Sequence, residues 1–202
     1  MSDAPGTRRS ERSRRTKETQ VDVCVVVDGQ GDVEVDTGLP FFDHMLSQLG
    51  RHSGMDLTIK ASGDLEVDAH HTVEDVGIVL GEALCGAVGD KKGIRRFASI
   101  ALPLDEALVE VALDVSGRPY LAYSVTLPPE APPLGSPGFD PQLAEEFWRA
   151  LVTSAGLTLH IRMITGKNTH HILEASFKAV ARSMHDALST EGSTLPSTKG
   201  VL

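Results

Sequence analysis

The stretch Asp68–Asp75, which reads DAHHTVED, decides how the rest of the chain is interpreted, because it contains the pattern His-His-x-x-Glu. On a helix, His70 and His71 lie four and three residues before Glu74, so each histidine can share a helix face with the glutamate. Neighbouring helical residues point about 100° apart, so one motif can serve two different metal ions. Neutral imidazole combined with carboxylate suits manganese, iron, zinc or nickel.

A second copy of the pattern lies about one hundred residues later, at Asn168–Glu174, which reads NTHHILE. A single copy has a simple alternative interpretation, a helix N-terminus with solvated histidines. The second copy argues against that alternative, because both copies belong to a longer internal repeat.

The repeat places Asp43–Leu49 opposite Glu145–Leu151 at an offset of 102 residues, which becomes 100 at the His-His pair. Ser53–Lys60 lies opposite Ala155–Arg162 at the same offset of 102. Each half therefore reads as helix, glycine turn, strand, loop, His-His-x-x-Glu and helix. The repeat also pairs a histidine and a glutamate, His44 and Glu146.

The composition is that of an ordinary globular protein, with 202 residues, 41% hydrophobic residues and 23% charged residues. The two cysteines, Cys24 and Cys85, support neither a disulfide framework nor a cysteine-based zinc site. They fit a reducing cytosol, so we expect a cytoplasmic protein. No apolar run is long enough to span a membrane, and the N-terminus lacks the apolar segment of a signal peptide.

The net charge of −9 is unevenly distributed. Residues 1–17 carry six basic residues against Asp3 and Glu11, a net charge of +4, which leaves −13 for the remainder. A basic arm can bind nucleic acid, but the acidic body and the lack of aromatic residues among the arginines favour a solvated, disordered tail.

Alternating valines from Val21 to Val27 predict a strand that starts near Glu18. Asp28–Gly31 is typical of a turn, and the alternation over Asp32–Thr37 predicts a second strand, so we expect a hairpin. Further helices are expected at 40–51, 71–88, 141–154 and 170–188, further strands at 55–61, 65–68, 107–115, 120–127 and 157–164, and a proline-rich loop at 128–141.

These elements predict an α+β fold with an internally duplicated unit, in which helices pack on one face of a sheet. We expect a disordered basic tail at 1–16, a first half at 17–104, a second half at 105–190 and a C-terminal tail at 191–202. Together the two halves would form one integrated domain.

Four segments together resemble the imidazoleglycerol-phosphate dehydratase family of histidine biosynthesis. They are Arg15–Thr19 (RTKET), Phe42–Leu46 (FDHML), the motif within Asp68–Gly77, and the motif within Gly166–Ala179. The resemblance covers about residues 13–202, and the combination of motifs is highly specific.

The resemblance implies a fold similar to the second domain of ribosomal protein S5, and a homo-oligomer of 24 subunits with metal sites at subunit interfaces. It implies a hydro-lyase that converts D-erythro-imidazoleglycerol 3-phosphate to imidazole-acetol phosphate. It also implies two Mn²⁺ ions per site, bridged by the substrate's imidazolate. Neither nucleic acid nor membrane is an expected partner.

Carried onto this chain, the family's metal ligands are His44, His70, His71, Glu74, His170, His171 and Glu174. The family's remaining ligand is a histidine before an aromatic pair, and this chain has Glu146 there. Three alternatives remain: Glu146 binds the metal, water completes the coordination, or His160 substitutes. Because His160 has Thr58 as its repeat partner, a structural role for it is favoured.

The resemblance nominates Glu18 as the catalytic base that abstracts the substrate proton. Its alternative is an exposed glutamate at a strand edge. The implied catalytic set is Glu18, His70, His71, Glu74, His170, His171 and Glu174.

The implied substrate contacts comprise Glu18, the ligand residues His44, His70, His71 and Glu74, the pocket residues Gln48, His52 and Lys178, and the phosphate set Arg96, Arg118, Ser197 and Lys199. Arg95 competes with Arg96 for its assignment. Simpler alternatives are a turn arginine for Arg118 and an intrahelical salt bridge to Glu174 for Lys178. His185 is expected to be a surface residue.

Two other functional classes compete with the lyase. A metal-storage or metal-sensing cage would use both His-His-x-x-Glu motifs but would have no need of the phosphate set. A dinuclear hydrolase is disfavoured, because such sites usually take several Asp and His ligands from strand ends. Some family members are fused to a phosphatase domain, which 202 residues cannot accommodate, so we expect a single activity.

Overall fold

The computed structural model describes residues 7–200 and 202, and it contains two similar halves. The first half is a four-stranded sheet in the order β1-β2-β4-β3 with two helices. Its strands are β1 (Arg9–Arg15), β2 (Thr19–Val26), β3 (Val33–Asp36) and β4 (Asp56–Gly63), and its helices are α1 (Pro40–Ser53) and α2 (His70–Val88).

The second half repeats this topology in the order β5-β6-β8-β7. Its strands are β5 (Phe97–Leu104), β6 (Ala107–Asp114), β7 (Tyr120–Ser124) and β8 (Thr158–Thr165), and its helices are α3 (Leu143–Ala155) and α4 (Thr169–Leu188). In each sheet the three long strands are antiparallel, and the short edge strand pairs in parallel.

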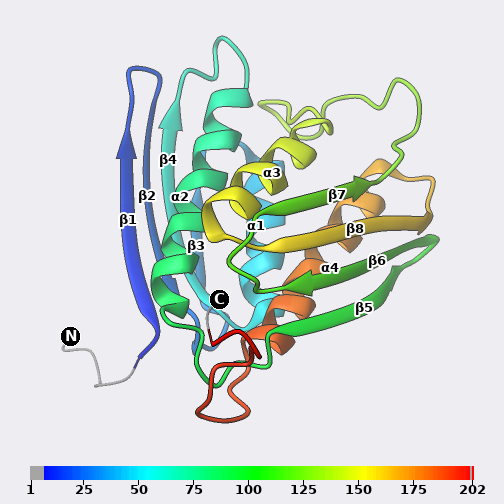
Figure 1. Cartoon of the computed structure of the whole chain (residues 1–202). Coiled ribbons are helices and arrows are strands. Elements are labelled where there is room, and N and C mark those ends of the chain that lie inside the picture. Colours follow the sequence, from blue (N-terminus) through cyan, green and yellow to red (C-terminus); the bar gives the residue numbers. More distant parts are fainter. Residues whose placement is uncertain (1–6, 201) are drawn as a thin grey trace.

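The four helices lie between the two sheets, with α2 against α3 and α1 against α4 (Figure 1). Two glycines of α2 allow its close approach to α3, because a Cβ at Gly77 would lie 2.8 Å from the carbonyl oxygen of Phe147 and a Cβ at Gly81 would lie 2.6 Å from that of Leu151. The α+β class and the duplicated unit are therefore confirmed. As predicted for the unit, the two helices of each half cover one face of a sheet, and each half has its own sheet.

The repeat also extends further than the sequence comparison showed. Strand β6 follows β2 at an offset of 88 residues, whereas β8 follows β4 at an offset of 102. The longer connection between β7 and α3 accounts for the change, and it contains the expected proline-rich loop. Because of this change of offset, the equivalence of β2 and β6 is hard to see from the sequence.

The expected hairpin of the two strands before α1 is wrong. Strand β3 pairs in parallel with β4, from Val33 opposite Leu57, while β2 lies between β1 and β4. The connection is tied to the start of β4 by Asp56, whose carboxylate accepts the backbone N–H of Gln30 and of Asp32. The chain thereby reaches the edge of β4 that lies opposite β2. The expected edge strand at 65–68 is a turn, closed by the N–H of Val67 on the carbonyl of Asp64.

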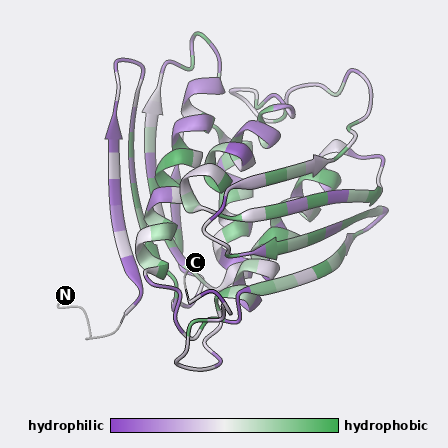
Figure 2. Cartoon of the chain, in the orientation of Figure 1, coloured by the Kyte–Doolittle hydropathy of each residue, from purple (hydrophilic) through white to green (hydrophobic). Residues whose placement is uncertain are grey.

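The expectation of a disordered tail at 1–16 is wrong for its described part, whereas residues 1–6 lie outside the described residues. The arginine-rich segment forms β1, paired with β2 from Arg9 opposite Val26 to Arg15 opposite Gln20. Figure 2 shows this strand as mainly hydrophilic. Strand β1 is held by its pairing with β2 and by an ion pair between Arg14 and Asp75 of α2.

The expected boundary between the halves at residues 104 and 105 is also wrong, because β5 belongs to the second sheet. The halves therefore meet in the connection 89–96. The C-terminal tail at 191–202 has neither helix nor strand among its described residues. No helix among residues 7–200 is both long and apolar enough to cross a bilayer.

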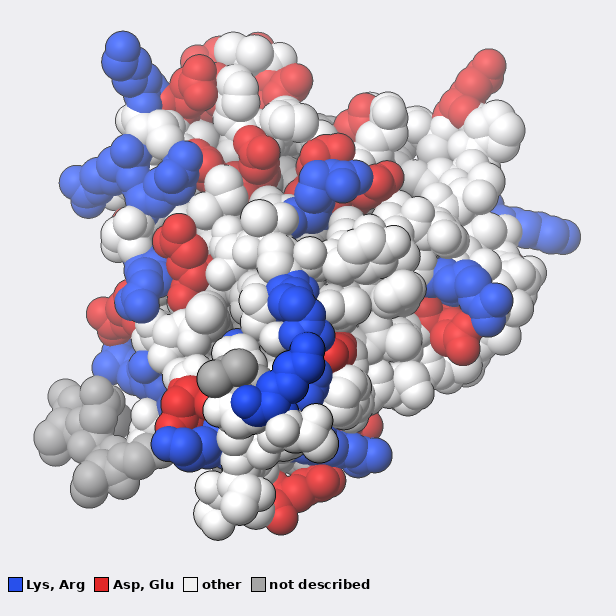
Figure 3. All heavy atoms as spheres, in the orientation of Figure 1, with Lys and Arg blue, Asp and Glu red and all other residues white. Residues whose placement is uncertain are grey.

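Basic and acidic side chains are mixed over the face seen in Figure 3. No continuous basic surface of the kind that binds nucleic acid is visible on that face.

Candidate metal and substrate site

The first turn of α4 and the first turns of α1 bring three possible metal ligands together. Nε2 of His170 lies 2.9 Å from Oε2 of Glu174, and Nε2 of His44 lies 3.5 Å from the same oxygen. The ligand atoms of the three residues all lie within 4.8 Å of one another. Two imidazole nitrogens and one carboxylate oxygen therefore converge from two helices that are distant in the sequence.

The start of α4 is fixed by Asn168, whose side-chain oxygen accepts the backbone N–H of His170 at 2.9 Å and of His171 at 3.4 Å. This cap satisfies two of the donors that a helix N-terminus leaves unpaired. The ring of Phe41 packs edge-on against His170, with 5.3 Å between centroids. The cap and this packing hold His170 toward α1.

The expected pocket residues extend from this cluster along α1 and α4. Oε1 of Gln48 lies 3.1 Å from Nε2 of His52, and Nε2 of Gln48 lies 3.5 Å from Nδ1 of His44. Lys178 places Nζ 2.6 Å from Oε1 of Glu174, so the intrahelical salt bridge is formed. These contacts place all three pocket residues beside the cluster.

Two groups beside the cluster have shifted pKa values. Burial raises the pKa of Glu174, but hydrogen bonds from Lys178 and His170 outweigh it, so the net shift is downward. Burial lowers the pKa of His52, and the nearby positive charges of Lys178 and Arg182 lower it further. Both shifts favour an ionised carboxylate and a neutral imidazole at neutral pH, the forms that bind metals and accept protons.

The residues that the repeat relates to these are His70 and Glu74 of α2 and Glu146 of α3. His70 and Glu146 line the same hollow, which has a volume of about 440 Å³, and Glu74 is exposed on α2. Within residues 7–200 and 202, this set does not draw three ligand atoms to within 4.8 Å. Glu146 nevertheless lines the same hollow as His70, as its pairing with His44 in the repeat predicted.

The two histidine rings of each motif are nearly perpendicular to each other. The ring of His70 makes an angle of 88° with that of His71, and the ring of His170 makes an angle of 80° with that of His171. Among the described residues, the group of three converging ligand atoms includes His170 but not His171.

The second histidine of each motif contacts a carboxylate. Nδ1 of His71 lies 3.0 Å from Oδ2 of Asp64 and 3.8 Å from Oε2 of Glu18, and Nδ1 of His171 lies 2.8 Å from Oε2 of Glu106. The hydrogen bond with Asp64 raises the pKa of His71, and the bond with Glu106 raises that of His171. The same bond lowers the pKa of Glu106 to about 2.

The sequence analysis missed both Asp64 and Glu106. Glu106 comes directly before β6, as Glu18 comes directly before β2, so the offset of 88 residues between these strands was a usable signal. Asp64 is a loop residue after β4, and its counterpart at the offset of 102 is Gly166, so no repeated acidic pattern pointed to it.

The phosphate set gathers at the other end of β6. Arg96 binds Asp114 through Nε at 2.7 Å and donates from Nη1 to the carbonyl oxygen of Pro196 at 2.7 Å. The tail continues past Ser197 to Leu202, whose carbonyl carbon would lie 2.9 Å from a Cβ placed on Gly117.

The remaining members of the phosphate set are nearby in the chain. Arg118 is exposed in the turn after β6, and the N–H of Lys199 donates to Oγ of Ser197 at 3.2 Å. Arg95 points to Glu191, with 3.7 Å between Nε and Oε1. The tail thus runs between the two arginines of the phosphate set.

Two other histidines lie outside this site. His160 is exposed on the outer face of the second sheet, with its ring 5.6 Å from that of Tyr120. It therefore does not replace the missing family histidine within its own chain. His185 is exposed as expected, and its Nδ1 lies 2.9 Å from the carbonyl oxygen of Ser53.

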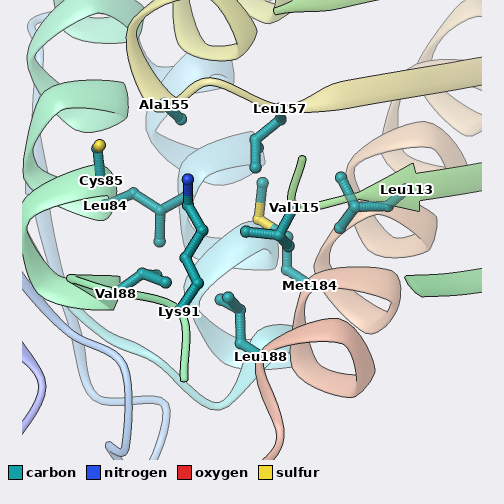
Figure 4. Close-up of a pocket in the computed structure, with 10 residues that line it drawn as sticks. All are labelled: Leu84, Cys85, Val88, Lys91, Leu113, Val115, Ala155, Leu157, Met184 and Leu188. Carbon is teal, nitrogen blue, oxygen red and sulfur yellow. The ribbon is translucent and has the colours of Figure 1, made fainter. Parts of the chain in front are cut away.

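A small hollow between the ends of α2 and α4 also lies apart from the site. Figure 4 shows its mainly apolar lining, with the sulfur of Cys85 and the amino group of Lys91 as its polar atoms. Its volume of about 10 Å³ accommodates about one water molecule. It offers no room for a substrate.

Comparison with known proteins agrees with this arrangement. A sequence model of the family described as imidazoleglycerol-phosphate dehydratase matches residues 37–184. An imidazoleglycerol-phosphate dehydratase of Symbiobacterium thermophilum is 54% identical over 192 residues, covering 94% of this chain and 90% of the relative. One from Cereibacter sphaeroides strain KD131 is 51% identical over 198 residues, covering 96% of this chain and all of the relative.

Solved structures agree as well. The crystal structure of the Staphylococcus aureus dehydratase superposes with a TM-score of 0.80 at 41% identity, covering 90% of this chain and 99% of that one. The Pyrococcus furiosus enzyme, solved in complex with (S)-C348, gives a TM-score of 0.80 at 36% identity, covering 95% of this chain and all of that one. Because both its sequence and its fold match, this chain belongs to the imidazoleglycerol-phosphate dehydratase family.

Proposed function

We propose that this dehydratase of histidine biosynthesis binds its substrate through two Mn²⁺ ions held by the His-His-x-x-Glu motifs. Family membership supports the overall reaction, in which imidazoleglycerol phosphate loses water to give imidazole-acetol phosphate. The observation that carries the metal proposal is the convergence of His44, His170 and Glu174 within 4.8 Å.

The donor set at this point fits a manganese ion. It offers two imidazole nitrogens and a carboxylate whose pKa is lowered, a combination typical of sites for first-row divalent metals. We assign His44, His170 and Glu174 to one ion, and His70, Glu74 and Glu146 to the other. Nδ1 of His71 and Nδ1 of His171 each contact a carboxylate outside these sets, so we assign the two rings to ions held mainly by neighbouring copies.

The proposed reaction needs a group that stabilises the substrate's imidazole ring and a base that accepts a proton. When bound, the metal ions would supply Lewis-acid stabilisation of negative charge on the substrate's imidazole ring. Glu18 accepts the proton from the adjacent carbon, which is not acidic in water. The side chain of Glu18 is 56% exposed, and its Oε2 lies 3.8 Å from His71, beyond hydrogen-bond distance, so its carboxylate is available to a ligand.

The separation of the two substrate-binding regions supports assembly of several copies. Glu106 and His171 lie at the start of β6, and Arg96 is bound to Asp114 at its end. The eight residues of β6 span roughly 23 Å at about 3.3 Å per residue. The substrate has only three carbons between its imidazole and its phosphate. A site that grips both groups therefore combines metal ligands of one copy with the phosphate set of another.

We accordingly propose a symmetric homo-oligomer, with the 24 subunits that the family resemblance implies. In such an assembly Gln48, His52 and Lys178 line the pocket, while Arg118, Ser197 and Lys199 reach the phosphate. Both cysteines, Cys24 and Cys85, are free thiols, which supports a reducing cytoplasmic location.

The test is turnover of imidazoleglycerol phosphate by the purified protein, first stripped with a chelator and then refilled with Mn²⁺. Activity that disappears on stripping and returns with Mn²⁺ is the expected result. Glu18→Gln should abolish turnover while Mn²⁺ binding persists, and Glu66→Gln, an exposed glutamate in the turn before α2, is the control. A refilled protein that binds Mn²⁺ but does not convert the substrate would favour a metal-binding cage.

A further inference from the structure

The second histidine of each His-His pair is held through the same ring atom by a carboxylate outside the motif. Nδ1 of His171 lies 2.8 Å from Oε2 of Glu106, and Nδ1 of His71 lies 3.0 Å from Oδ2 of Asp64. A carboxylate accepts only, so the imidazole donates in both bonds. Each ring is therefore protonated at Nδ1 in this arrangement.

Glu106 is itself immobilised. Its second oxygen, Oε1, accepts the backbone N–H of Asn168 at 2.8 Å and of Lys167 at 3.2 Å. Both carboxylate oxygens are thus engaged, one by the loop before α4 and the other by His171. The hairpin turn between β5 and β6 and the start of α4 are locked together at the position of the ring.

The two carboxylates are not repeat equivalents. Glu106 follows Glu18 at the offset of 88 residues that relates β6 to β2, whereas the offset of 102 that relates β8 to β4 pairs Asp64 with Gly166. The halves therefore supply the same contact from different places in the fold. A contact inherited from the duplication would use equivalent positions. Because the two positions are not equivalent, what the halves share is a carboxylate at Nδ1 of the second histidine.

We propose that Glu106 and Asp64 are positioning residues that keep Nδ1 of His171 and His71 protonated and so leave Nε2 as the metal-binding nitrogen. This inference rests on the proposed function, which makes both histidines metal ligands. A neutral imidazole has one donor and one acceptor nitrogen, and a carboxylate on the donor side fixes both the tautomer and the ring orientation.

The assignment also explains why equivalent glutamates can have different roles. In the second half Glu106 is occupied by His171. In the first half Asp64 binds His71 at 3.0 Å, and Glu18 stays 3.8 Å from the same nitrogen. Asp64 thereby leaves the Glu18 carboxylate available for proton abstraction.

The experiment is a titration of the metal-free full-length protein with Mn²⁺, followed by calorimetry and by the electron paramagnetic resonance of the bound ion. Glu106→Ala and Asp64→Ala should each weaken Mn²⁺ binding by about 10- to 100-fold at one class of site. Glu106→Gln keeps an acceptor for Nδ1–H and should lose less than about tenfold. Glu110→Gln removes a charge from β6, where the carboxylate binds Arg162, and should bind Mn²⁺ like the wild type.

His171→Ala in the same titration separates failure of the inference from failure of the proposed function. Loss of Mn²⁺ binding in His171→Ala, together with wild-type binding in Glu106→Ala, would overturn the positioning role alone. Unchanged binding in His171→Ala would overturn the metal assignment and the inference with it.

A readout without metal excludes a merely structural role. Nitrogen-15 chemical shifts of the neutral His171 ring should report protonation at Nδ1 in the wild type and in Glu106→Gln, and a mixture of tautomers in Glu106→Ala. Circular dichroism at the same time checks that α4 is intact. An unchanged tautomer in a folded Glu106→Ala protein would contradict the inference.

Discussion

Arg14 and Asp75 are 61 residues apart in the sequence, yet Nε of Arg14 lies 2.8 Å from Oδ1 of Asp75. The Asp75 side chain is only 10% exposed and also accepts a hydrogen bond from the hydroxyl of Thr19. This contact ties the outermost strand of the first sheet to α2, one of the two helices that begin with a His-His pair.

We predict that Arg14→Ala lowers the free energy of unfolding by about 1–2 kcal/mol, because it leaves a buried carboxylate with one partner fewer. Amide hydrogen exchange across Arg9–Arg15 should become faster at the same time. Lys60→Ala, which breaks an exposed pair with Glu34, is the control and should change stability by less than about 0.5 kcal/mol. Equal effects of the two substitutions would contradict this account of β1.

Two buried serines of α4 make a matched pair for stability. Oγ of Ser176 donates to the carbonyl oxygen of Ile172 at 2.8 Å, whereas Oγ of Ser183 has no hydrogen-bond partner among the described residues. Removing an unsatisfied hydroxyl is favourable, and alanine is the better helix former. We expect Ser183→Ala to be more stable than Ser176→Ala by about 1 kcal/mol in urea unfolding at one protein concentration. The reverse order would show that the hydroxyl of Ser183 is satisfied in solution.

The metal cluster predicts the effect of removing single ligands. Glu174→Ala or His44→Ala should weaken Mn²⁺ binding roughly a hundredfold or more, since the effect of a direct ligand exceeds the 10- to 100-fold typical of outer-shell residues. Glu146→Ala tests the departure from the family pattern and should weaken binding at the second ion. His160→Ala, on the outer face of the second sheet, should bind Mn²⁺ normally. A large loss in His160→Ala with none in Glu146→Ala would move the ligand assignment to His160.

His52, which is not one of the assigned metal ligands, predicts a pH dependence of stability. Burial lowers its pKa below 6.5, and Lys178, Arg182 and Arg51 lower it further against the opposing charge of Glu174. The unfolded chain therefore binds the proton more readily, so the contribution of His52 to stability is complete above about pH 6.5 and declines as the pH falls toward the lowered pKa.

His52→Gln should remove this contribution. The difference in unfolding free energy between wild type and His52→Gln should be larger at pH 7.5 than at pH 5.5, measured in the metal-free protein. A difference that grows on acidification would mean that the folded state raises the pKa of His52 instead.

Much of the site follows from local sequence patterns. The spacing of His170 and Glu174 places them on one helix face whatever surrounds the helix, and Asn168 caps that helix through its own neighbours. The duplicated order of helices and strands could likewise be predicted, because hydrophobic periodicity is a property of short segments.

The sequence by itself therefore determined the motifs, the α+β repeat and the residue types available for metal and phosphate. Only the tertiary structure decided that β3 pairs with β4, that the arginine-rich segment becomes β1, and that Glu106 and Asp64 hold the histidine rings. It also decided that the metal cluster and Arg96 lie near opposite ends of β6. These features depend on hydrogen bonds and ion pairs between segments that are distant in the chain, and no local pattern encodes which of the many available partners will meet.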